Sequence, residues 1–64
     1  MKNLDAMGIT DYYDQLPFGD KDAFIREVAD AIGKSSQSVR RKIRLGCWSK
    51  PEMPLVNDVI NGRG

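Results

Sequence analysis

The stretch FIREVADAIGKSSQSVRRKIR, residues 24–44, decides the fold of this chain. The apolar residues of its first half recur at three- and four-residue spacing: Phe24, Ile25, Val28, Ala29 and Ile32. This spacing predicts one helix whose apolar stripe faces inward. Gly33 follows directly and ends the helix, because glycine readily adopts the left-handed conformation common after a helix.

The second half of the stretch predicts another helix, over residues 35–45. Ser35 can cap it, since a serine oxygen accepts a hydrogen bond from an unpaired first-turn amide. Val39 and Ile43 lie one turn apart and face inward, and Gly46 closes the helix. Two short helices at a fixed angle are therefore expected.

The segments on either side of this stretch predict one further helix each. Thr10 or Asp11 can cap a helix that runs to Leu16, where Pro17 and Gly19 end it. Its buried face would be aromatic and aliphatic: Tyr12, Tyr13, Leu16 and Phe18. Asp20 would cap the helix of the central stretch.

After the loop CWSKPEM, Pro54 suits a first helical position, and the next apolar residues have amphipathic spacing: Leu55, Val56, Val59 and Ile60. The expected fold is a small all-α domain of four helices, about 10–16, 20–32, 35–45 and 54–61. Residues 1–9 would form an N-terminal arm, residues 10–61 the domain and residues 62–64 a tail.

Composition excludes several classes of site. The chain has no histidine and one cysteine, Cys47, so we expect neither a zinc site nor an internal disulfide, and no cofactor. With no nucleophile and base to pair, we expect no enzyme. No apolar run approaches the ~20 residues of a membrane span, and MKNLDAMG lacks the apolar core of a signal peptide. A cytoplasmic location without membrane or small-molecule substrate is expected.

The net charge of +1 conceals a strong asymmetry. Residues 1–33 hold seven acidic and three basic residues, whereas residues 34–64 hold seven basic and two acidic ones. Such segregation orients a molecule in the field of a polyanion. The alternative is that the two halves of the chain attract each other within the fold.

The helix over 35–45 carries its polar residues on one side. At about 100° per residue, five of them fall within an arc of about 140°: Ser36, Gln37, Arg40, Arg41 and Arg44. Glutamine can pair with adenine, arginine with guanine, and serine with base edges or phosphate. Phosphate contacts are expected from the remaining polar residues nearby: Lys34, Ser35, Lys42 and Lys50.

Three residues stand at a characteristic spacing: Ala29, Gly33 four residues later, and Val39 six after that. With Val28 and Ile32 at the other apolar positions of the pattern, the stretch from Ile25 to Arg44 resembles the helix-turn-helix of phage repressor and Cro-type DNA-binding proteins. This resemblance implies that the helix from Ser35 enters the DNA major groove. It also implies that the base-reading residues are Ser36, Gln37 and Arg41, with Arg40 and Arg44 flanking them.

One position departs from the family pattern. An apolar residue is expected three positions after Val39, but Lys42 stands there and Ile43 follows. The helix can therefore be rotated, which leaves open whether Arg40 or Arg41 is the principal base reader. The stretch VRRKIRLGCW also resembles winged helices of the excisionase and MerR type, but PEMPLVNDVIN predicts a helix where those proteins continue into a β-wing.

The expected function is sequence-specific binding of double-stranded DNA in transcription regulation. One such unit buries only about 600–1,000 Å² on DNA, so we expect a two-fold dimer through residues 54–61. The alternative is a small helical protein-interaction module that uses the same basic face against an acidic partner. Trp48 would cover the end of the core or lie against the sugar-phosphate backbone.

Overall fold

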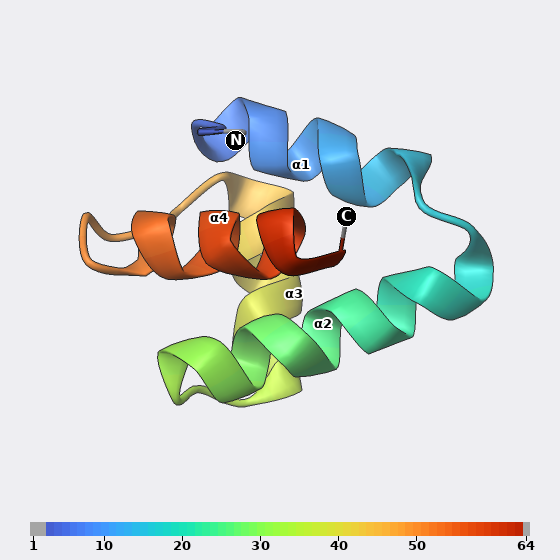
Figure 1. Cartoon of the computed structure of the whole chain (residues 1–64). Coiled ribbons are helices and arrows are strands. Elements are labelled where there is room, and N and C mark those ends of the chain that lie inside the picture. Colours follow the sequence, from blue (N-terminus) through green and yellow to red (C-terminus); the bar gives the residue numbers. More distant parts are fainter. Residues whose placement is uncertain (1–2, 64) are drawn as a thin grey trace.

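The computed structural model describes residues 3–63, and most of them lie in four α-helices. These are α1 (Ala6–Gln15), α2 (Phe18–Ile32), α3 (Ser36–Leu45) and α4 (Glu52–Arg63). In Figure 1, α1, α4 and α2 form the front of the molecule and α3 crosses steeply behind α4. The described residues contain no strand, which confirms the predicted all-α, four-helix class.

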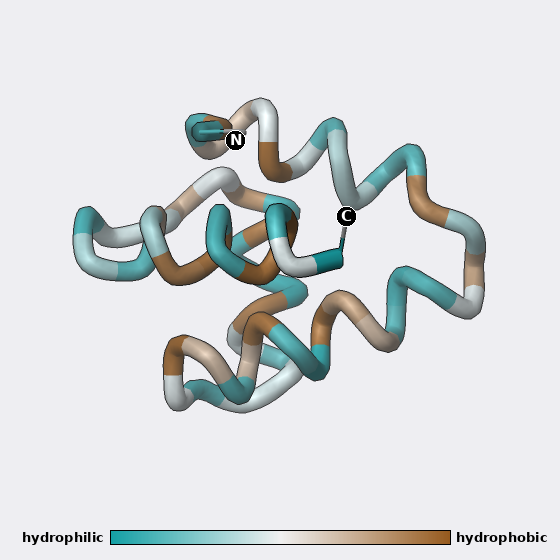
Figure 2. The backbone as a smooth tube through the Cα atoms, viewed as in Figure 1, coloured by the Kyte–Doolittle hydropathy of each residue, from teal (hydrophilic) through white to brown (hydrophobic). Residues whose placement is uncertain are grey.

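All four helices contribute to a single core. Its buried hydrophobic residues are Ile9, Phe24, Ile25, Val28, Ala29, Val39, Ile43, Val56 and Ile60. Figure 2 shows the hydrophobic positions recurring along the helices between hydrophilic ones. The stripe predicted for α2 is confirmed, with Ile32 packed at the edge of the core. Because the core draws on every helix, the arrangement of α2 and α3 depends on α1 and α4.

The predicted start of α1 was wrong. Its cap is Asp5, whose carboxylate accepts a hydrogen bond from the Gly8 amide at 2.8 Å, rather than Thr10 or Asp11. Residues 6–9 of the expected arm are therefore helical, and Ile9 among them is fully buried. An acidic cap four residues before the first core residue accounts for the earlier start.

The predicted start of α2 was also wrong. The helix begins at Phe18 directly after Pro17, which precedes it without any side-chain cap, and Asp20 lies in the first turn instead of capping. Proline's fixed φ suits a helix entrance, and Asp20 still complements the helix dipole there. Phe18, expected in the core, is 88% exposed because this early start turns it outward.

The turns that bound α3 match their predictions. Gly33 and Gly46 have φ values of 68° and 65°, the left-handed conformation expected at each. Ser35 is the cap of α3, and its side chain accepts a hydrogen bond from the Ser38 amide. Val39 and Ile43 are 0% and 4% exposed, so the inward face of α3 is also confirmed.

The last helix begins at Glu52, two residues before the predicted first position at Pro54, and continues through Arg63 into the expected tail. The Ser49 amide donates to Glu52 Oε1 at 3.0 Å, while the Ser49 carbonyl accepts from the amides of Glu52 and Met53. This is the reach-back contact of a capping box, for which Ser49-Lys50-Pro51-Glu52 has the required spacing.

The apolar residues of α4 on which a dimer surface was predicted face largely into this chain's own core. Val56 and Ile60 are 0% and 3% exposed, and Val59 is half-buried. Only Leu55, at 38%, counts as exposed. The core of this chain thus buries most of the apolar side of α4 on which contact with a second subunit was predicted.

A buried amide joins α4 to the segment before α1. Asn57 Oδ1 accepts from the Leu4 amide at 2.6 Å, and Asn57 Nδ2 donates to the carbonyl oxygens of Leu4 and Met53, each at 3.0 Å. The Asn57 side chain thus satisfies the backbone amide and the backbone carbonyl of Leu4. Asn57 itself is only 5% exposed. This contact fixes the start of the described chain against its last helix.

No helix in the part of the chain that the structure describes combines the length and apolar character needed to cross a membrane.

Candidate nucleic-acid interface

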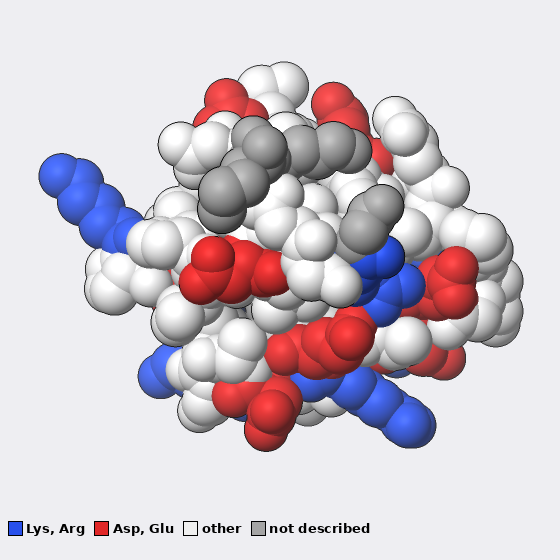
Figure 3. All heavy atoms as spheres, in the orientation of Figure 1, with Lys and Arg blue, Asp and Glu red and all other residues white. Residues whose placement is uncertain are grey.

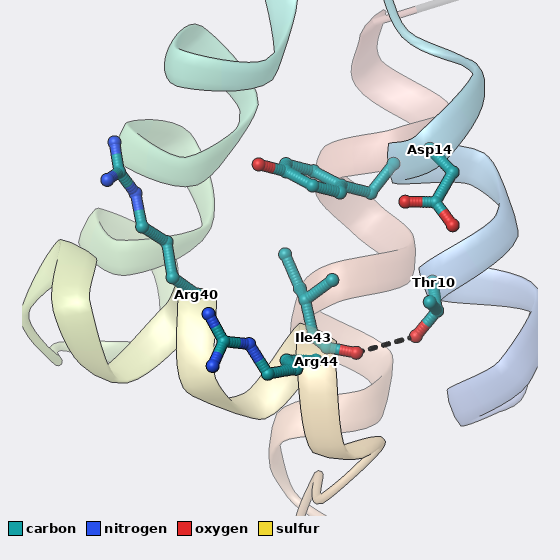
Figure 4. Close-up of a pocket in the computed structure, with 6 residues that line it drawn as sticks. Thr10, Asp14, Arg40, Ile43 and Arg44 are labelled. Carbon is teal, nitrogen blue, oxygen red and sulfur yellow. Dashed lines mark hydrogen bonds between the residues drawn. The ribbon is translucent and has the colours of Figure 1, made fainter.

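The inner side of α3 is held from two directions. Val39 and Ile43 join Val28 and the rest of the α2 stripe in the core. On the α1 side, Thr10 Oγ1 donates to the Ile43 carbonyl oxygen at 2.8 Å, the contact dashed in Figure 4. Thr10, predicted as a helix cap, thus holds the last turn of α3 against α1. These contacts fix which side of α3 faces solvent.

The side of α3 that remains exposed carries the predicted base-reading residues. Gln37, Arg40, Arg41 and Arg44 are all exposed and, with Leu45, line one shallow hollow along the helix. A second hollow at the helix start is lined by Ser35, Gln37, Ser38 and Arg41. Ser36 is exposed in the first turn but is not among the residues lining either hollow. We call Gln37, Arg40, Arg41 and Arg44 the arginine face.

Arg40 and Arg44 also border a third hollow, between α1 and α3. Figure 4 shows both arginines extending to one side of Ile43, with Thr10 and Asp14 of α1 on the other side. Arg40 leans toward α2, where its Nη2 lies 3.0 Å from Asp22 Oδ1. Both side chains of this pair are about 60% exposed, so water weakens the attraction and the pair can open at little cost.

Lys42 does not belong to the arginine face. Its Nζ lies 3.0 Å from Oε1 of Glu52, and its side chain is 23% exposed. The position that the family pattern gives to an apolar residue thus holds a lysine whose charged end is neutralised by α4. The predicted phosphate contact at Lys42 has no support in this geometry, because the ammonium group already has a buried partner.

The surroundings of Glu52 favour its charged form. The hydrogen bond from the Ser49 backbone amide is the main cause that lowers the pKa of Glu52, and the Lys42 ammonium lowers it further. Burial acts in the opposite direction without reversing the result. At neutral pH the carboxylate is therefore charged, and its ion pair with Lys42 holds the end of α3 against the start of α4.

The other predicted phosphate contacts lie at the two ends of α3. Lys34, in the turn before the helix, and Lys50, in the loop after it, are exposed. The Ser35 hydroxyl is already used within the cap, where it accepts from the Ser38 amide and donates to Ser38 Oγ at 3.1 Å. Ser35 therefore shapes the start of α3, while the two lysines present free charge.

Trp48 packs against the core, as the first of its two predicted positions requires. It is half-buried, and its Nε1 is buried without a hydrogen-bond partner among the described residues. Cys47 beside it is exposed. Among residues 3–63, no group of three acidic, cysteine or histidine side chains is placed to hold a metal ion.

Two residues of this region were missed by the sequence analysis. Asp22 was given no role in this region from the sequence, although it faces Arg40 across the two helices. Glu52 was left in a loop, although the Ser49-x-x-Glu52 spacing could have predicted its capping role. Helical periodicity does not predict the Asp22–Arg40 contact, because the two residues are 18 positions apart and lie on different helices.

Charge is unevenly spread over the surface. Figure 3 shows the side on which α4 and α2 lie in front of α3, and acidic side chains gather near its centre while several Lys and Arg side chains project at its edges. Among the described residues, the exposed arginines of α3 are Arg40, Arg41 and Arg44. Two ion pairs, Arg40–Asp22 and Arg63–Glu27, join acidic residues of the first half of the sequence to basic residues of the second half, as the alternative interpretation of the charge asymmetry expects.

No protein-family model, curated protein or solved structure matches this chain.

Proposed function

We propose that this chain binds double-stranded DNA in a sequence-specific manner, as a helix-turn-helix protein that regulates transcription. The observation that carries the proposal is the arginine face: a glutamine and three arginines on the exposed side of a ten-residue helix whose other side is fixed by the core. A helix of this kind can enter a major groove, and these side chains match the edges of adenine and guanine.

The geometry suggests a division of roles along α3. Gln37 and Arg41 border the hollow at the helix start, where helix-turn-helix proteins contact bases, so we assign base reading to them. Arg40, held toward α2 by Asp22, is better placed for flanking phosphates. Lys34 and Lys50 would contact the backbone at either end of the helix. The lead reader is accordingly Arg41.

A binding role without catalysis agrees with a chain that has no histidine to act as a base beside its one cysteine. Action on DNA also agrees with the expected cytoplasmic location. The rival role, in which the same face binds an acidic protein, differs in one measurable respect: it requires no preferred base sequence.

Selection of bound duplexes from a randomised library tests the proposal directly. We expect an enriched motif at near-physiological salt, and its loss in the double variant Gln37→Ala, Arg41→Ala. Lys34→Ala is the matched control, since removing a phosphate contact weakens all sequences equally and leaves the motif intact. Absence of any enriched motif from the unmodified chain would overturn the proposal in favour of the acidic-partner role.

A further inference from the structure

Two exposed apolar side chains meet where α1 begins and α3 ends. Met7 is 77% exposed and Leu45 is 64% exposed, and both line one surface hollow. The backbones approach closely there, because a Cβ built on Gly46 would lie 3.9 Å from that of Ala6. Large apolar side chains exposed together mark interaction sites more often than isolated ones do.

The same hollow is lined by one acidic and one basic residue, Asp11 and Arg44. Both are exposed, and neither belongs to an ion pair among residues 3–63, where the pairs join Arg40 to Asp22, Lys42 to Glu52 and Arg63 to Glu27. Asp11 lies one turn after Met7 on α1, and Arg44 directly precedes Leu45 on α3. Each helix thus contributes one apolar and one charged side chain.

We propose that this surface, formed by Met7, Asp11, Arg44 and Leu45, binds the same surface of a second copy of the chain. In a two-fold contact, one residue of the first copy meets a different residue of the second copy, and the same two residues meet again with the copies exchanged. A surface that carries both charges around an apolar centre is therefore complementary to itself. Asp11 of each copy then pairs with Arg44 of the other, while the apolar side chains cover one another. A surface of one charge would repel its copy.

This contact replaces the one predicted through residues 54–61. Val56 and Ile60 are committed to the core, whereas Met7 and Leu45 contact solvent. Only a few side chains take part, and stable interfaces bury about 800 Å² on each partner, so the dimer should be weak in isolation.

One consequence rests on the proposed function. A contact at the end of α3 leaves its first two turns, which hold Gln37 and Arg41, on the side away from the two-fold axis. Each α3 is about 15 Å long. Two such helices end to end would separate their first turns by about 30 Å, near the ~34 Å between successive major-groove sites. Arg44 would then serve the dimer in place of base reading.

The test measures self-association without DNA, so it is independent of the proposed function. Sedimentation equilibrium up to about 1 mM chain should detect a monomer–dimer equilibrium. Leu45→Glu should weaken it at least about tenfold, equivalent to about 1.4 kcal/mol. Phe18→Glu is the control, because Phe18 is a more exposed apolar residue on another part of the surface. Circular dichroism confirms that each variant is folded.

A charge exchange tests the pairing itself. Asp11→Arg and Arg44→Asp should each weaken the dimer, and the two substitutions combined should restore it. A chain that stays monomeric at the highest concentration would overturn the inference, as would equal weakening by Leu45→Glu and Phe18→Glu. Failure of the combined variant to restore association would contradict the Asp11–Arg44 pairing and with it this geometry.

Discussion

Lys42 Nζ and Glu52 Oε1 lie 3.0 Å apart, and this ion pair joins the last turn of α3 to the first turn of α4. Glu52 also accepts the Ser49 amide, so one carboxylate both caps α4 and neutralises the lysine beside the arginine face. The stability of the fold and the orientation of α3 therefore both depend on the buried carboxylate of Glu52.

Acid should weaken the fold through Glu52. Because its pKa is lowered in the folded state, the unfolded chain takes up a proton first as the pH falls. The stabilisation is complete above the ordinary pKa of a glutamate and is lost as the pH drops through the lowered value. Glu52→Gln should reduce the free energy of unfolding by about 1–3 kcal/mol at pH 7, and this difference should shrink as the pH falls through the lowered pKa of Glu52. Urea denaturation at several pH values measures this.

Asp58→Asn is the matched control, since Asp58 is an exposed acid on the same helix. It should change stability by less than about 0.5 kcal/mol at any pH. If Glu52→Gln and Asp58→Asn gave the same pH dependence, the capping role of Glu52 would be refuted.

In the proposed binding of DNA, Lys42 should contribute little compared with Lys34. Lys42→Met keeps the side-chain stem, and because the ammonium group faces Glu52, the salt dependence of DNA affinity should stay unchanged. Lys34→Met should reduce the magnitude of the slope of log K against log salt by about one. Fluorescence anisotropy across a salt series distinguishes them. Equal slope changes would show that Lys42 leaves Glu52 to contact phosphate.

Asp22 should restrain Arg40. Asp22→Asn releases the guanidinium from its 3.0 Å contact, so Arg40 can turn to a phosphate and strengthen binding to all sequences. The expected result is a steeper salt dependence, by about one phosphate contact, and a smaller ratio of specific to non-specific affinity. Asp30→Asn removes the same charge from an exposed position on α2 that forms no ion pair with α3 among residues 3–63, and it should alter neither slope nor ratio beyond a uniform shift. Identical behaviour of the two variants would exclude a specific role for Asp22.

The Asn57 amide should be worth about 2 kcal/mol of stability. Asn57→Ala removes three hydrogen bonds and leaves the Leu4 amide and carbonyl without their partners. Asp58→Ala is also a truncation to alanine, at the next position of the helix, which is exposed. It should lower the free energy of unfolding far less. Hydrogen exchange of the Leu4 amide should accelerate in Asn57→Ala alone. Unchanged exchange there would show that Leu4 is protected by something other than Asn57.

The parts of the fold that the sequence predicted are those governed by local rules. Gly33, Ser35 and Gly46 were placed correctly because a left-handed turn and a serine cap involve only neighbouring residues. The stripes of α2 and α3 followed from helical periodicity. The starts of α1, α2 and α4 were predicted too late, since several residues near each of them are able to begin a helix.

The rest depended on contacts between residues far apart in the chain. The apolar side of α4 packs into this chain's own core, to which α1 contributes Ile9, a residue that the predicted start of α1 left outside the helix. The rotation of α3, and with it the direction of the arginine face, likewise depends on the contact of Lys42 with Glu52, which the sequence did not predict. Periodicity locates the face of a helix but does not identify what lies opposite it.

The contact between Asn57 and Leu4 also bears on the order of events during synthesis. Its two residues are 53 positions apart, so the segment before α1 meets its partner only after the first half of α4 has been translated. The entropic cost of closing such a long loop grows slowly with length, but it must be met before the contact forms. A nascent chain that ends before residue 57 thus lacks the side chain that binds Leu4, and we expect the native arrangement of α1 to form only after residue 57 has been translated.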